Sequence, residues 1–412
     1  MAVALILIDA LSPVYVSRET LPELYNLADN GFIGPLANIY AYRGIEATLF
    51  TGQWPDEHGV WGEFSPTLPR REHLGSQLAN LVIGVGDCIP SDRLRLDVRY
   101  VVSRLSQPGR MLPTGNLIPV SLMPRFKASI EQPIWEKDSL GTTITLFDEL
   151  RAGGRAFVAI VNPAVQNDDQ IVDRARDVIA RGSLPDFWYI KFSALDALGH
   201  RFGPDVSRMA PALAILNDQL VALCGELKRA YGKQGIDIIV VSDHGMSQVR
   251  DRIDIRALMK GLRASPGRDY LYFLDSTTVR FWSPDRRLCD DFAQLFAGKD
   301  TLRVVTPDTR QMFHIPNGDQ SGDVMLALEE GTVVFPDFFR RQVMPVGMHG
   351  YAVVRSEAGL PFLAVEQTVA HSLPSRDPLT HVSVWAAMRE RLGFPSVNTS
   401  RGLDAHPGAH AA

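Results

Sequence analysis

Short apolar runs alternate with segments of helical periodicity along most of the chain. Four of these runs, residues 2–8, 156–161, 187–192 and 237–241, have the length and the β-branched or aromatic content of buried strands. The first is continuously apolar, as strands buried on both faces are. We therefore expect these four segments to form the centre of a sheet.

The segments between the runs predict helices. Leu21, Leu24 and Leu27 recur at helical spacing, with Thr20 as the expected N-cap and Gly31 at the C-terminal end. Asn167 and Gln170 offer a capping box. The helices expected further along the chain cover residues 146–150, 167–180, 209–231 and 381–392. Repeated β-α-β units with long crossovers predict an α/β fold with a mostly parallel central sheet and helices on both faces.

Two segments interrupt this rhythm and divide the predicted domains. Residues 85–132 are rich in Pro and Arg without clean periodicity, and they predict an inserted cap or lid. Residues 262–345 predict a smaller α+β addition, with strands at 270–274, 278–282 and 324–328 and a helix at 288–296. The α/β core would then comprise residues 1–84, 133–261 and 346–395, followed by a flexible tail at 396–412.

The composition is that of an ordinary globular enzyme, with 45% apolar residues, 22% charged residues and a net charge of −5. This balance favours neither a nucleic acid polymer nor a membrane surface as partner, and it indicates no particular oligomeric state. Three cysteines without CxxC spacing fit a reducing compartment, so we expect a cytoplasmic protein. The apolar start lacks a basic n-region and ends in Asp9, which favours a buried strand over a signal peptide.

Acidic and imidazole side chains follow three of the predicted strands, where an open parallel sheet binds its ligands. Each one alone has an ordinary structural explanation, such as a helix cap for Asp9 or a helix-surface pair for Asp196 and His200. Asp243 beside His244 is harder to explain in this way, because two ionisable groups at a buried strand end need compensating partners. The full set is Asp9, Asp196, His200, Asp243, His244 and His349.

Three carboxylates and three imidazoles suit two divalent metal ions. Imidazole with carboxylate favours Zn²⁺, and mixed oxygen and nitrogen sites also accept Mn²⁺ or Fe. Two such ions can activate a nucleophile and neutralise charge on a phosphoryl group. The inventory therefore predicts a binuclear metal site at the edge of the sheet.

Five motifs, "LIDA", "LFTGQWPDEHGVWG", "DALGHRFGP", "SDHGM" and "GMHGY", occur in the order and approximate spacing of the alkaline phosphatase superfamily. They resemble its nucleotide pyrophosphatase/phosphodiesterase branch most closely. The resemblance implies one metal site formed by Asp196, His200 and His349. It implies a second site formed by the remaining ligands, Asp9, Asp243 and His244.

The sequence departs from this family at the nucleophile. Members usually place Thr or Ser nine residues before the Thr of the "TG" step, here Thr51, and a count without gaps reaches Tyr42. The same count puts Glu63 where relatives often carry an Asn that contacts phosphate. A carboxylate there would repel a phosphate unless it were protonated or bound to a metal. These two replacements indicate a changed mechanism or substrate.

Three nucleophiles compete. Tyr42 could attack as a phenolate, although its bulk would displace the phosphorus from metals spaced for a short side chain. Thr48 lies about two helical turns further on, so we expect its hydroxyl to point elsewhere. Attack by a metal-bound hydroxide, with Glu63 orienting or deprotonating the water, is the interpretation we favour. Tyr42 and Glu63 could also be packing and surface residues of a degenerate site.

The sequence thus predicts a binuclear metallohydrolase of a small phosphoester, a phosphodiester or a pyrophosphate of nucleotide or nucleotide-sugar type. Zn²⁺ is the expected metal and Mn²⁺ the alternative. Two alternatives remain: a related hydrolase or transferase with another substrate, and a metal-binding protein that has lost turnover. Arg43 and Lys191 are secondary candidates for neutralising an anionic substrate.

Overall fold

A computed structural model gives the fold. It describes residues 1–67, 94, 98, 101, 117–119, 122–161, 167–375 and 378–395. Most of the predicted cap at 85–132 and the whole predicted tail at 396–412 lie outside the described residues, and the division into domains stays a prediction.

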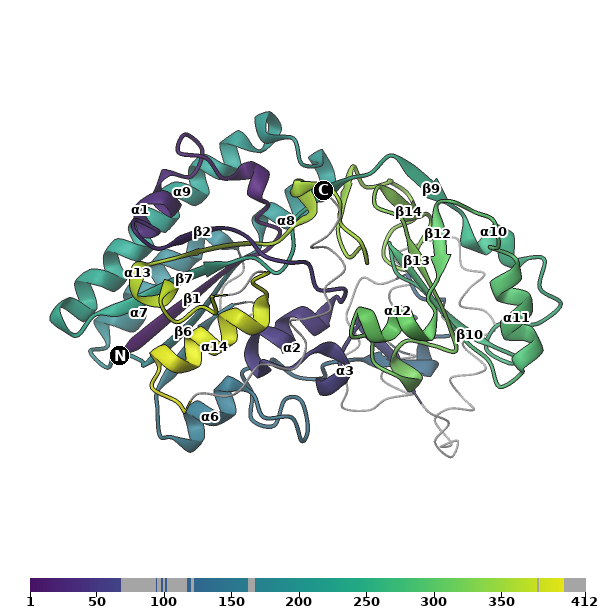
Figure 1. Cartoon of the computed structure of the whole chain (residues 1–412), viewed down its shortest axis with the longest axis horizontal. Coiled ribbons are helices and arrows are strands. Elements are labelled where there is room, and N and C mark those ends of the chain that lie inside the picture. The colour runs from purple at the N-terminus through teal and green to yellow at the C-terminus, as the bar shows by residue number, and fades with distance from the viewer. Residues whose placement is uncertain are drawn as a thin grey trace.

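A six-stranded mixed sheet forms the centre of the larger lobe, in the order β2-β16-β7-β1-β6-β5 (Figure 1). Four neighbouring strands are parallel, as predicted: β7 (Ile236–Val241), β1 (Ala2–Ile8), β6 (Phe187–Phe192) and β5 (Phe157–Ile160). The remaining two were not predicted. β16 (Phe362–Val365) runs antiparallel to β7, and β2 (Phe32–Pro35) pairs antiparallel with β16.

Helices cover both faces of this sheet because its central strands are apolar on both faces. Alternate residues of β1 belong to separate hydrophobic clusters, with Ile6 on one face and Leu5 on the other. The helices on the first face are α1 (Pro22–Leu27), α7 (Ile171–Ala180) and α9 (Val206–Tyr231). Those on the second face are α2 (Arg43–Thr51), α6 (Leu146–Ala152) and α14 (His381–Arg391). The predicted α/β architecture is confirmed.

The longest described helix, α9, has 26 residues and is amphipathic. Its buried side chains recur every three or four residues, as at Leu213, Leu216 and Leu220, so one stripe packs on the sheet. Within the described ranges, no helix combines the length and the apolarity needed to span a bilayer.

Two predicted helix starts are wrong in detail. Thr20 does not cap α1, because its hydroxyl donates to the carbonyl of Tyr15 at 2.6 Å and the helix begins at Pro22. Asn167 forms no side-chain cap either. A 3₁₀ turn precedes α7, and Asp168 within it accepts N–H groups from Ser193 and the residue after it. In both cases a longer-range partner takes the place of the local cap.

A second, antiparallel sheet lies in the smaller lobe, in the order β10-β11-β13-β12, and has its own aromatic cluster. The strands predicted here are confirmed as β10 (Leu271–Leu274), β11 (Thr278–Trp282) and β13 (Val324–Leu328). β12 is Leu302–Val304, and the helices are α11 (Arg286–Gln294) and α12 (Pro307–Met312). The predicted helix starts earlier than expected because Asp285 caps it.

The remaining short helices and strands lie in both lobes and in the segments that join them. They are α3 (Pro55–His58), β3 (Phe64–Pro66), β4 (Phe126–Ala128), α8 (Ala194–Phe202), β8 (Ser247–Gln248), β9 (Asp251–Ile253), α10 (Ile255–Met259), β14 (Thr332–Val334), β15 (Gly347–Met348) and α13 (Gln367–Ala370).

A buried ion pair holds the smaller sheet to the connecting segments. Arg280 of β11 is fully buried, and one of its terminal nitrogens lies 3.2 Å from Asp275. The other donates to the carbonyls of Phe64 at 2.8 Å and Gln320 at 2.9 Å. Burial raises the pKa of Asp275 to about 6, although the charge of Arg280 opposes this rise. The single guanidinium group of Arg280 therefore contacts three separate segments of the chain.

We expect Arg280→Met to lower the free energy of unfolding by ~3–5 kcal/mol, because removing one member of a buried pair leaves the other charge uncompensated. Urea denaturation measures this loss. The matched control is Arg286→Met, because Arg286 and Asp290 form an exposed pair at 3.9 Å that should contribute under ~1 kcal/mol. Equal losses in the two variants would contradict the structural role of Arg280.

Candidate metal centre

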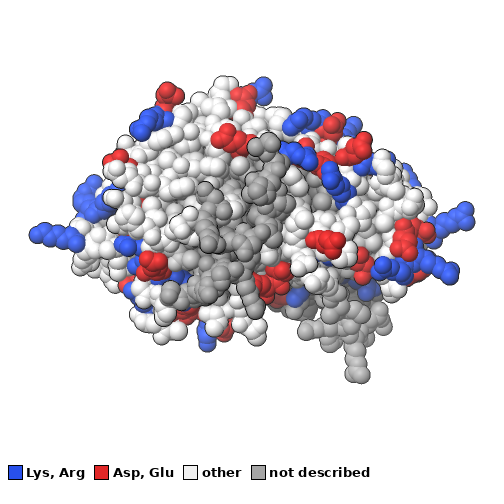
Figure 2. All heavy atoms as spheres, in the orientation of Figure 1, with Lys and Arg blue, Asp and Glu red and all other residues white. Residues whose placement is uncertain are grey.

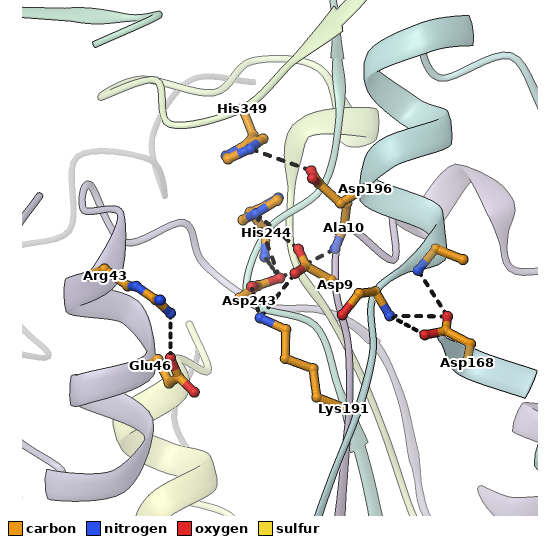
Figure 3. Close-up of polar contacts among 12 residues, drawn as sticks. Asp9, Ala10, Arg43, Glu46, Asp168, Lys191, Asp196, Asp243, His244 and His349 are labelled. Atoms are coloured by element: carbon orange, nitrogen blue, oxygen red, sulfur yellow. Dashed lines mark hydrogen bonds and ion pairs between the residues drawn. The ribbon is translucent and has the colours of Figure 1, made fainter. Parts of the chain in front are cut away.

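The six predicted ligand side chains meet at the carboxyl ends of the parallel strands, and Figure 3 shows all of them except His200. Asp9 follows β1 directly, and Asp243 and His244 follow β7. α8, which begins after β6, carries Asp196 and His200 one turn apart. His349 follows β15, which pairs with β8 just beyond the end of β7. The positions are those at which open α/β sheets bind their ligands.

Asp196 is the centre of the first group. Its Oδ1 atom lies 3.3 Å from Nε2 of His200 and 3.5 Å from Nε2 of His349. The same oxygen is buried and has no hydrogen-bond partner among the described residues. A buried acceptor without a donor is costly, so the group is one that a cation would complete.

Asp9, Asp243 and His244 form the second group. Nε2 of His244 lies 3.4 Å from Oδ1 of Asp9 and 3.7 Å from Oδ1 of Asp243. The His244 ring also stacks on the His349 ring, with centroids 3.6 Å apart and an interplanar angle of 6°. The two groups are thus in direct contact.

Two sets of three ligand atoms have all members within 4.8 Å of one another: Asp9, Asp243 and His244, and Asp196, His244 and His349. The first set is the one that the resemblance implies. The second contains His244 in place of His200, although His200 reaches Asp196 directly. His244 therefore lies between the two candidate metal positions.

Backbone carbonyls fix the orientation of two imidazole rings. Nδ1 of His200 lies 2.9 Å from the carbonyl of Gly347, and Nδ1 of His244 lies 3.0 Å from that of Gly245. Because a carbonyl can only accept, each Nδ1 carries the proton and donates it. Each Nε2 then turns its lone pair toward the carboxylates, which is the arrangement of metal-ligating histidines.

Close backbone packing makes the contact to His200 possible. A side chain at Gly347 would place its Cβ 2.4 Å from the carbonyl oxygen of Gly199 in α8. Only glycine therefore lets β15 approach α8 closely enough for His200 to reach the Gly347 carbonyl.

Burial and mutual charge shift the pKa values of these groups in different directions. Burial lowers the pKa of His200 to about 4 and holds the pKa of His349 well below its ordinary value. Burial raises the pKa of Asp196 to about 6, and the charge of Asp9 adds to the rise. For His244, burial alone would lower the pKa, but the charges of Asp243 and Asp9 raise it. The site therefore combines two neutral imidazoles, those of His200 and His349, with carboxylates that need positive charge.

Tyr42 points its phenol away from the ligand atoms. Its oxygen lies 2.5 Å from the hydroxyl of Thr277, and that hydroxyl donates its only proton to the carbonyl of Gly350. Tyr42 must therefore be the donor. Burial raises its pKa above the ordinary value, and the charge of Asp275 adds to this effect. The protonated phenol of Tyr42 therefore links the two lobes through its hydrogen bond to Thr277.

Thr48 is fully buried in α2. Nδ1 of His58 accepts the N–H of Val60 at 3.1 Å, and burial lowers the pKa of His58 to about 4. The neutral ring therefore carries its proton on Nε2, which lies 3.1 Å from the Thr48 hydroxyl. As expected from the sequence, His58 holds a turn and Thr48 points away from the ligand atoms.

Glu63 forms an ion pair with Arg43 at 3.4 Å, and its side chain is 35% exposed. Arg43 also pairs with Glu46 at 3.1 Å, and Glu46 accepts the hydroxyl of Tyr189 at 2.7 Å. Figure 3 shows Arg43 and Glu46 beside the metal ligands, on α2. Glu63 is thus joined to the site through Arg43, the residue after Tyr42.

Three tryptophans of the larger lobe and the connecting segments have packing roles. Trp61 is fully buried and donates to the carbonyl of Tyr40 at 2.7 Å. Trp54 stacks on His314 with centroids 4.2 Å apart, and Trp135 packs at the edge of the core.

Lys191 is closer to the site than the sequence indicated. Its ammonium lies 2.9 Å from Asp9 and 3.7 Å from Asp243. The signal was present, because Lys191 is the only charged residue in an otherwise apolar run at 187–192.

Comparisons with known proteins agree with this fold. The family model for type I phosphodiesterase/nucleotide pyrophosphatase matches residues 3–352. Bis(5'-adenosyl)-triphosphatase ENPP4 of Bos taurus is 24% identical over 399 residues, which cover 95% of this chain and 78% of that protein. Its Homo sapiens counterpart is 25% identical over 203 residues, covering 48% of this chain and 42% of that protein.

Two solved structures share the fold over nearly the whole chain. Human ectonucleotide pyrophosphatase/phosphodiesterase 5 superposes with a TM-score of 0.65 at 13% identity, covering 99% of this chain and 97% of that one. An inactive threonine-to-alanine variant of the murine protein, in complex with AMP, has a TM-score of 0.66 at 16% identity, with coverage of 99% and 97%. The chain therefore belongs to the type I phosphodiesterase/nucleotide pyrophosphatase family, a group of phosphoester hydrolases in the alkaline phosphatase superfamily.

Proposed function

We propose that this protein hydrolyses a phosphodiester or pyrophosphate of nucleotide or nucleotide-sugar type, with two divalent metal ions and with water as the attacking group. The convergence of five carboxylate and imidazole side chains at one sheet edge, with His200 beside Asp196 as the sixth, carries the proposal. The nucleotide character is supported by the relatives, one of which is named a bis(5'-adenosyl)-triphosphatase and another of which was solved with AMP.

The donor atoms suit the metals that the family requires. Asp196, His200 and His349 would hold one ion, and Asp9, Asp243 and His244 the other, with Zn²⁺ favoured by the donor set and Mn²⁺ as the alternative. The partnerless Oδ1 of Asp196 and the fixed Nδ1–H groups of His200 and His244 support this assignment. When bound, such ions supply charge neutralisation for phosphoryl oxygens and a lower pKa for water.

Water is the proposed nucleophile because the hydroxyls of Tyr42 and Thr48 are both engaged in other contacts. The phenol of Tyr42 is protonated and donates to Thr277, and the hydroxyl of Thr48 is buried against His58. The murine relative in complex with AMP is an inactive threonine-to-alanine variant. In this chain the count from the motif reaches Tyr42 where the family usually carries a small hydroxyl, which favours attack by water over attack by such a hydroxyl.

Glu63 is the candidate base that orients or deprotonates the water. Its carboxylate is partly exposed and is held by Arg43, whose pKa is raised first by the charge of Glu63 and also by that of Glu46. A general base must lie close enough to the water to accept its proton, and the ion pair with Arg43 fixes where the Glu63 carboxylate lies. Arg43 is in addition a donor for an anionic substrate.

The surface supports a small-molecule substrate. Figure 2 shows basic and acidic side chains interspersed over the described part of this face, unlike the continuous basic stripe that binds nucleic acid polymers. A cytoplasmic location remains a prediction. It fits Cys224 and Cys289, which are buried free thiols.

Tyr42 and Glu63 also favour a second candidate function. A related hydrolase or transferase acting on another ester would keep the same metal ligands and alter the residues around the attacked atom. Metal binding without turnover on a panel of phosphate and sulfate esters would support this candidate or a protein that has lost catalysis.

Asp243→Ala and His349→Ala should each remove bound metal and abolish hydrolysis of bis-p-nitrophenyl phosphate and diadenosine triphosphate. Removing even a residue that only orients a ligand weakens metal binding ~10–100-fold, so loss of a ligand should cost at least as much. Metal content after dialysis and initial rates measure both effects. His371→Ala is the control, because His371 is exposed and lies outside the site. Full activity after chelation would contradict the proposal.

Tyr42→Phe should keep kcat within about threefold of the wild-type value and lower stability by ~1 kcal/mol, the typical contribution of one hydrogen bond. Steady-state kinetics and urea denaturation separate the two effects. A loss of rate comparable to that of Asp243→Ala would instead identify the phenol as the nucleophile.

Glu63→Gln should lower kcat by at least ~100-fold with little change in bound metal, since a general base contributes about 10²–10⁴ to the rate. Glu57→Gln is the control, because Glu57 caps α3 by accepting the N–H of Trp54 and contacts none of the proposed ligands. An unchanged rate in Glu63→Gln would remove Glu63 from the mechanism.

A further inference from the structure

Lys191 lies among the proposed ligands without being one of them. It projects from β6, and its side chain is only 16% exposed (Figure 3). Its ammonium contacts Oδ2 of Asp9 at 2.9 Å and Oδ2 of Asp243 at 3.7 Å. The lysine therefore places a fixed positive charge against one of the two candidate metal groups.

In both Asp9 and Asp243, Oδ2 faces the ammonium of Lys191 and Oδ1 faces the imidazole of His244. Oδ1 of Asp9 and Oδ1 of Asp243 face Nε2 of His244, at 3.4 and 3.7 Å. Oδ1 of Asp243 also accepts backbone N–H groups from Ala10 at 3.3 Å and from His244 at 3.0 Å. Each carboxylate thus turns one oxygen toward His244 and the other toward the ammonium.

Among the described residues, Glu46 is the other carboxylate whose charge acts on Lys191. Glu46 is already engaged, because it accepts the hydroxyl of Tyr189 at 2.7 Å and pairs with Arg43 at 3.1 Å. The ammonium is therefore committed to Asp9 and Asp243.

Within the described residues, the other metal group has no lysine or arginine in direct contact with Asp196, although the charges of Arg340 and Lys191 act on Asp196 from further away. Among the described residues, the charged or chargeable neighbours of Asp196 within 4.0 Å are His200 and His349. Both imidazoles have lowered pKa values because they are buried, so they present neutral nitrogens. A divalent ion bound there meets one carboxylate and no lysine in direct contact with it.

We propose that Lys191 is a built-in cation that makes the two metal groups unequal: Asp196, His200 and His349 bind the first divalent ion tightly, and Asp9, Asp243 and His244 bind the second more weakly. The inference rests on the proposed function. Its physical basis is that the ammonium already offsets one of the two carboxylate charges in the second group and repels an incoming ion.

Binding of Mn²⁺ alone to the metal-free full chain tests this inference, by calorimetric titration and by metal content at fixed free Mn²⁺. The wild type should show two steps at least about tenfold apart, because like charges at this range repel strongly. Lys191→Met should tighten the weaker step at least about tenfold and leave the other nearly unchanged. Lys191→Arg, which keeps the charge, should resemble the wild type.

Two equal steps in the wild type would overturn the inference. An unchanged or weaker second step in Lys191→Met would also overturn it, because Lys191 would then only orient the carboxylates. Lys191→Gln is a second uncharged variant if the methionine variant does not fold, with folding checked by circular dichroism.

The Asp196→Ala variant separates this inference from the proposed function. If Asp196→Ala retains the tight step, the assignment of the metal ligands fails. If it loses the tight step while Lys191→Met binds Mn²⁺ like the wild type, only the role of Lys191 fails.

Discussion

The need to compensate three buried carboxylates at one edge of the central sheet shapes this protein. Burial and the charge of Asp9 raise the pKa values of Asp196 and Asp243. Burial would also raise the pKa of Asp9, but the charges of Lys191 and His244 lower it. The chain surrounds the three carboxylates with Lys191, the imidazoles and backbone N–H groups, and the family to which it belongs adds metal ions. Strand order makes this crowding unavoidable, because β1 lies between β6 and β7 and all three end together.

The smaller lobe completes the site from the opposite side through aromatic hydroxyls. Tyr40 contacts the hydroxyl of Thr278 at 2.7 Å, and Tyr42 donates to the adjacent Thr277. The ring of Tyr42 fills the space above Gly350, where a Cβ would lie 2.6 Å from it. Tyr42 thus fixes the segment carrying His349 and holds the two lobes together.

Much of the fold and the ligand set could be predicted from sequence because both depend on local patterns. Buried parallel strands are continuously apolar, and their carboxyl ends gather ligands, so Asp9, Asp243 and His244 could be found directly. The edge strands β2 and β16 were missed since each has only four residues, and β2 ends in Gly34 and Pro35. No comparable local signal marks their pairing.

Contacts between distant residues could not be predicted in this way. The hydroxyl that accepts from Tyr42 lies 235 positions away, and nothing near Tyr42 reveals it. The same holds for the sharing of carboxylate oxygens by Lys191 and His244, which depends on how three strands align.

Gly347 shows how little freedom this arrangement leaves during evolution. Because the backbone of β15 passes so close to Gly199, even one added methyl group would separate the loop bearing His349 from α8. Descendants of this protein could vary their substrate by changing the partly exposed residues around Arg43. A substitution at Gly347, in contrast, would first require a compensating substitution in α8.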